Sequence, residues 1–102
     1  MDNPEYTEIQ INEALKAATG LPITVSWDGS EPCSGETANF EVCFGGDTID
    51  ILVRDHGPSF DIRERLRPGY YVTCDQAARY DTLAEKVIGI IETDMASGRL
   101  GE

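Results

Sequence analysis

The sequence is poor in basic residues, and in lysine above all. Its 102 residues include 8 Lys or Arg, only two of them lysines (Lys16 and Lys86), against 19 Asp or Glu, so the formal net charge is −11. Proteins bind DNA, RNA and anionic membranes through clustered Lys and Arg, so this shortage argues against direct binding to any of them. No apolar run approaches the ~18 residues of a membrane span, and the N-terminus is acidic, so we expect neither a span nor a signal peptide.

Cysteine and histidine are also scarce. The cysteines are Cys33, Cys43 and Cys74, none with CxxC spacing, and His56 is the only histidine. An odd set of cysteines favours a reducing compartment, so we expect a cytoplasmic protein. These four residues include the ligand types of a zinc site, but they lack the close pairs of structural zinc modules. We therefore predict no metal and no other cofactor.

One short segment has residues of the kind that catalyse reactions. Asp55 and His56 precede a glycine in a predicted loop, where catalytic residues often lie. A Cys–His pair would need a thiolate near the imidazole, and no recognised sequence surrounds Cys43 or Cys74. We predict that the chain is not an enzyme. A small enzyme that uses His56, Asp55 and a cysteine remains as an alternative.

The negative charge is concentrated in the first half of the chain. Residues 1–53 hold ten acids and one base, whereas residues 54–102 hold nine acids and seven bases. No Lys or Arg occurs in the 37 residues between Lys16 and Arg54. Such asymmetry favours an acidic interaction surface. Solubility alone, or adaptation to high salt, would produce a similar composition, and both stay open as explanations.

Apolar periodicity predicts a helix near each end of the chain. Residues 4–19 place Ile11, Leu15 and Ala18 on one stripe, and Gly20 follows at a position suited to a helix C-terminus. A second apolar stripe runs between Asp75, a suitable N-cap, and Gly98.

Four segments alternate between apolar and polar residues, as strands with one buried face do. They are residues 23–28, 40–44, 48–54 and 70–74. Gly45-Gly46 predicts a tight hairpin, residues 29–38 a long acidic loop, and residues 55–69 one helical turn or an exposed loop. The prediction is a single α+β domain, residues 1–102, in the order α-β-β-β-β-α. Its sheet is four-stranded and mainly antiparallel, with both helices packed on one face.

The other face of this sheet is left to solvent or to a partner. It would display Ser26, Asp28, Glu41, Cys43, Asp50, Leu52, Arg54, Tyr71 and Thr73. Carboxylates on such a grid form a negative field around apolar anchors, a combination that binding interfaces use. We predict partner contacts by the carboxylates of Asp28, Glu31, Glu36, Glu41, Asp47 and Asp50, with Leu52 and Tyr71 as anchors.

The one basic cluster is Arg63, Arg65 and Arg67, which we expect to pair with the chain's own acids. The complement of an acidic surface is a basic one, and basic protein surfaces largely serve to hold nucleic acid. We therefore predict a protein-binding module that inhibits a nucleic-acid-handling partner.

In size and charge the chain is similar to phage anti-restriction and anti-CRISPR inhibitors and to the immunity proteins of nuclease toxins, although no motif is shared. The alternative is a secretion-chaperone-like or scaffold subunit, in the form of a homodimer. Such a subunit would bind an extended segment through Leu52, Tyr71 and exposed strand edges.

Overall fold

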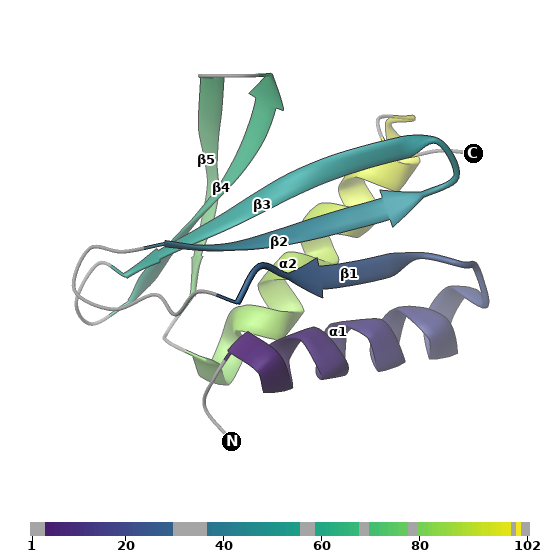
Figure 1. The fold of residues 1–102 in the computed structure, drawn as a ribbon, viewed down its shortest axis with the longest axis horizontal. Helices are drawn as coiled ribbons and strands as arrows, with labels where there is room; N and C mark the ends of the chain where they lie inside the picture. Colours follow the sequence, from purple (N-terminus) through teal and green to yellow (C-terminus); the bar gives the residue numbers. More distant parts are fainter. Residues whose placement is uncertain are drawn as a thin grey trace.

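The computed structural model describes residues 4–29, 37–55, 59–67, 70–77, 80–98 and 100. The elements are α1 (Pro4–Thr19), β1 (Thr24–Trp27), β2 (Thr37–Phe44), β3 (Asp47–Asp55), β4 (Phe60–Arg67), β5 (Tyr70–Ala77) and α2 (Tyr80–Ala96). The strands form one antiparallel sheet in sequential order, β1 to β5. In Figure 1, α1 runs alongside β1 and α2 crosses behind the sheet.

One hydrophobic cluster joins the helices to the sheet. It contains Phe40, Val42, Ile51, Val53 and Ile62 from the strands, and Ile11, Leu15, Leu83, Val87 and Ile91 from the helices. Successive strand side chains point to opposite faces, so these alternating residues define a single buried face. Both helices therefore cover the same side of the sheet, and the predicted α+β class with a helix at each end is confirmed.

Residues 55–69 differ from their prediction. Neither a helical turn nor a loop forms over Phe60–Arg67, which is strand β4, so the sheet has five strands instead of four. Phe60 and Ile62 point into the core, but the next inward position holds Glu64, whose side chain is only 4% exposed. An acid in an apolar position breaks the alternation that identifies a strand.

The start of the last helix also differs. Asp75 lies within β5 opposite Ile62, and Ala77 is the last residue of that strand. Asp75 is therefore no N-cap, and α2 starts at Tyr80. The apolar stripe that predicted this helix does face the core, where Val87 and Ile91 are buried.

The predicted glycine hairpin sets the register between β2 and β3. Phe44 pairs with Asp47, so Gly45 and Gly46 make the whole connection. Gly45 has a φ of 63°, the left-handed region that tight hairpins need at their first central residue. This register places Glu41 directly opposite Asp50.

Two side chains of α1 close the free edge of β1. The Asn12 amide donates from Nδ2 to the Val25 carbonyl at 2.8 Å, and its Oδ1 accepts from the Val25 N–H at 2.9 Å. The Trp27 N–H donates to Glu8 Oε2 at 2.6 Å. Residues four apart on a helix are separated by about 6 Å and residues two apart on a strand by about 6.6 Å, so the two spacings match. This edge is consequently not open to another strand.

Replacing Asn12 by Ala is expected to lower the free energy of unfolding by about 1–2 kcal/mol, because the Val25 N–H and carbonyl both lose their partner. Urea denaturation measures this change. The matched control is Glu13→Ala, an exposed site on the same helix where the expected change is within about 0.5 kcal/mol. Equal losses in the two variants would show that the edge contacts add no stability.

Two glycine substitutions should have opposite effects. Gly89 lies inside α2, and a Cβ there would have no atom within 4 Å, so Gly89→Ala should raise the free energy of unfolding by about 0.5–1 kcal/mol. Gly45→Ala should lower it by about 1 kcal/mol because of the positive φ. Thermal melts of both proteins test the pair, and a shift in the same direction for both would contradict this account.

Candidate protein-binding surface

The strand register defines the face of the sheet that points away from the helices, called here the outer face. In the described part of the chain it consists of Thr24, Ser26, Thr37, Asn39, Glu41, Cys43, Thr48, Asp50, Leu52, Arg54, Asp61, Arg63 and Arg65. Ser26, Glu41, Asp50 and Arg65 form one row across four strands. The sheet thus brings together residues that are up to 39 positions apart in the sequence.

Several predicted contact residues lie on or beside this face. Glu41, Asp50 and Leu52 belong to it, and Asp28 is exposed directly after β1, where its N–H donates to the Asn39 carbonyl. The positions of Tyr71 and Thr73 continue the rows through Arg65 and Arg63 in the β4–β5 ladder. Asp47 lies opposite Phe44, on the core-facing side at the hairpin. Glu31 and Glu36 lie outside the described residues.

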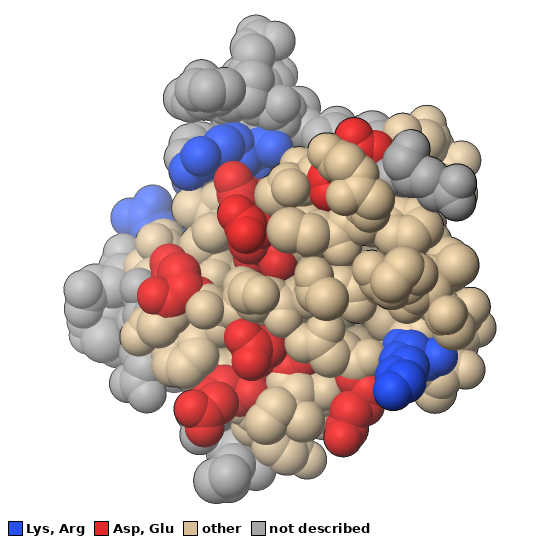
Figure 2. All heavy atoms as spheres, turned by 45° about the vertical axis from the view of Figure 1, so that its right-hand side comes forward, with Lys and Arg blue, Asp and Glu red and all other residues tan. Residues whose placement is uncertain are grey.

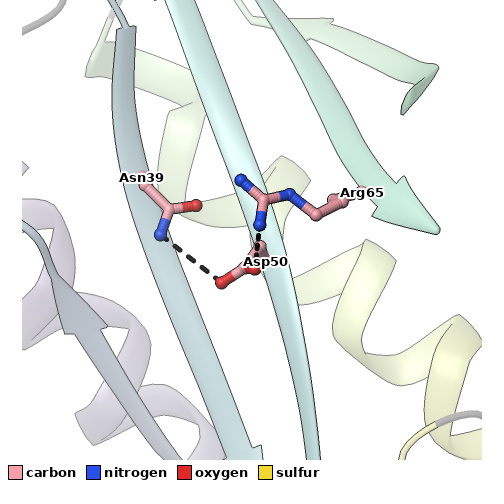
Figure 3. Close-up of polar contacts among 3 residues, drawn as sticks. All are labelled: Asn39, Asp50 and Arg65. Atoms are coloured by element: carbon pink, nitrogen blue, oxygen red, sulfur yellow. Dashed lines mark hydrogen bonds and ion pairs between the residues drawn. The ribbon is translucent and has the colours of Figure 1, made fainter. Parts of the chain in front are cut away.

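Asp50 is held by neighbours on both sides (Figure 3). Asn39 Nδ2 donates to its Oδ1 at 3.4 Å, and Arg65 Nη1 lies 3.5 Å from its Oδ2. The expectation that this arginine cluster pairs with the chain's own acids is therefore confirmed for Arg65. The outer face is not uniformly acidic, because β4 adds Arg63 and Arg65 to it.

The other half of the outer face is formed by β1 and β2 and carries exposed acidic groups. Glu41 is exposed on β2, and Asp28 is exposed at the end of β1. Neither β1 nor β2 contains a Lys or Arg, and Lys16 is the only base of α1. Figure 2 shows the acidic groups spread over the visible surface in separate places, with the basic groups toward its margins.

Of the two expected apolar anchors, Leu52 and Tyr71, the structure describes the side chain of Leu52. Leu52 is half-buried in the outer face, in one row with Asn39 and Arg63. Its remaining exposure offers a partner a small apolar contact. The Tyr71 side chain lies outside what the structure describes, so only its strand position is known.

A hollow of about 300 Å³ lies between β4 and α2. It is lined by Glu64, Glu85, Lys86, Gly89, Ile90, Thr93 and Asp94. Glu64 and Asp94 are buried, with exposed fractions of 4% and 5%. The sequence does not predict this hollow, because the inward position of Glu64 follows from strand β4, where the sequence predicts a loop or a helical turn. Three carboxyl groups and one lysine are among its walls.

Among the residues considered for catalysis or metal binding, the structure describes the side chains of Cys43 and Asp55. Cys43 is half-buried on the outer face, with its Sγ 3.6 Å from Thr48 Oγ1 and 3.8 Å from Glu41 Oε1. Cys33 and His56 lie outside the described residues, as does the side chain of Cys74. Within the described ranges, no three His, Cys, Asp or Glu side chains are grouped so that they could hold a metal ion.

Neither helix, over the residues that the structure describes, is long and apolar enough to cross a membrane. Comparisons of the chain with known protein families, with curated proteins and with solved structures gave no match.

The Asp50–Arg65 pair is expected to contribute less than about 1 kcal/mol, since both side chains are partly exposed, at 22% and 40%. A double-mutant cycle with Asp50→Ala and Arg65→Ala, measured by urea denaturation, gives the coupling energy. That energy should fall further as salt is raised. A coupling above about 2 kcal/mol that ignores salt would contradict the description of this pair as a surface contact.

Proposed function

We propose that the chain is a non-enzymatic cytoplasmic module that docks on the basic surface of a partner protein. That surface is one that handles nucleic acid, so docking inhibits the partner. The observation that carries the proposal is the exposed carboxylate of Glu41 on the half of the outer face whose strands hold no Lys or Arg, with the exposed carboxylate of Asp28 directly after β1.

The position of these carboxylates supports steering by charge. Glu41 is in the middle of β2, between Ser26 on one side and Asp50 on the other, so the sheet fixes its backbone. Charges fixed on a rigid surface increase the rate at which an oppositely charged partner is encountered. The neighbouring Asp50 already interacts with Arg65, so Glu41 is the better candidate for contact.

The sealed β1 edge counts against the alternative of binding an extended segment there. Strand addition uses free backbone groups, and here the Val25 N–H and carbonyl are bonded to Asn12 and the Trp27 N–H to Glu8. A partner that approaches the β1 edge would therefore contact side chains. This favours binding through complementary side-chain surfaces over strand addition at β1.

The double variant Asp28→Lys with Glu41→Lys should slow association with the partner more than about 10-fold while the fold is kept. The partner is first captured from lysate of the native cells on the immobilised chain and identified by mass spectrometry. Association rates are then measured with the purified partner at low and high salt. The matched control is Glu85→Lys with Glu92→Lys, which makes the same charge change at exposed positions of α2.

The proposal requires three results together. The control variant should associate nearly as fast as the natural chain. High salt should slow the association of the control and of the natural chain, and added nucleic acid should compete with them for the partner. If the Asp28 and Glu41 variant binds as fast as its control, the acidic half of the outer face is not the docking surface. A partner that nucleic acid does not displace would rule out the inhibitory role.

A further inference from the structure

Three large apolar side chains are exposed in the described part of the chain. Tyr6 and Ile9 lie on α1 and Leu21 in the turn that follows it, with exposed fractions of 37%, 47% and 39%. Isolated apolar residues on a surface need no explanation. Here, however, Tyr6 and Ile9 are three residues apart on one helix and therefore neighbours on its surface.

Carboxylates flank Ile9 along the helix. Glu5 precedes it by four residues and Glu13 follows it by four, and both are exposed. Residues four apart lie one above the other, with about 5–6 Å between their Cβ atoms. Ile9 is thus the centre of a short column with an acid one turn away on either side.

The core and the β1 edge use other residues of α1. Ile11 and Leu15 point into the core, and Glu8 and Asn12 hold β1. Ile9 is therefore a position where a polar residue would cost the fold little. An apolar centre with a charged rim is the composition of the energetically important part of many interfaces.

We propose that the outward face of α1, formed by Glu5, Tyr6, Ile9 and Glu13, binds a basic amphipathic helix of the partner. An apolar residue of that helix packs on Ile9, and a Lys or Arg one turn to either side of it lies against Glu5 or Glu13. This inference rests on the proposed function and adds the element, and the kind of partner segment, through which docking is anchored.

Charge and geometry both select this occupant. The two acids require basic groups, and their separation of two helical turns is repeated on another helix by residues eight apart. An extended segment gains affinity from main-chain hydrogen bonds to a strand edge, which a helix surface does not offer. Two helices pack through side chains alone, as this face requires.

The test places the photoreactive residue p-benzoylphenylalanine at position 9, at position 41 or at position 92, and irradiates each protein in lysate of the native cells. The cross-linked peptides of the captured partner are sequenced by mass spectrometry. We expect position 9 to cross-link to a helical segment with Lys or Arg four residues before and after an apolar residue. Position 41 should cross-link elsewhere in the same partner, and position 92, exposed on α2, to none of it.

A pair of substitutions provides the second measurement. Ile9→Ser should weaken binding of the purified partner by about 10-fold, as loss of an interface anchor does. Ile9→Leu keeps an apolar side chain and should stay within about twofold. Both variants should melt at the temperature of the natural chain, because Ile9 is exposed.

The outcomes separate this inference from the proposed function. If position 41 cross-links to a partner whose binding is charge-dependent, but position 9 gives no cross-link or reaches a non-helical or acidic segment, the α1 inference is overturned and the proposed function stands. Unchanged binding by Ile9→Ser also overturns the inference alone. If neither position 9 nor position 41 reaches a partner, both are overturned.

Discussion

The contacts between α1 and the edge of β1 determine which surfaces this protein can offer. Asn12 presents an amide to Val25 much as a neighbouring strand would, and Glu8 accepts the N–H of Trp27. These bonds fix the rotation of α1 about its own axis. With that rotation set, the apolar stripe of Ile11 and Leu15 faces the core. Ile9 is consequently turned outward.

A closed edge changes how a partner can bind. An open strand recruits other chains through its backbone, with little regard for sequence, and is a route to aggregation. Here the Val25 N–H and carbonyl and the Trp27 N–H are bonded to α1, so what this side offers near β1 is side chains such as Glu41 and Asp28. Side chains allow selection by charge, which a bare strand edge does not provide.

The parts of the fold that the sequence predicts are those with a local signal. The stripe of α1, the Gly45 turn and the alternation in β2 and β3 all depend on residues close together in the chain. Strand β4 is not predicted because Glu64 occupies an inward position and breaks the alternation. The sequence predicts that the arginines pair with acids, but without β4 it does not identify Asp50 as the partner of Arg65. The Asn12 contacts have no local signal, because they depend on where α1 lies against the sheet.

The net charge of −11 is unevenly compensated over the outer face, because its basic residues lie on one half of that face. Across the β3–β4 half of the outer face, Arg54, Arg63 and Arg65 share the surface with the acids, so the field there is weakened. Across the β1–β2 half, neither strand contains a Lys or Arg. A molecule polarised in this way orients a basic partner before contact, because the attraction is strongest on one side.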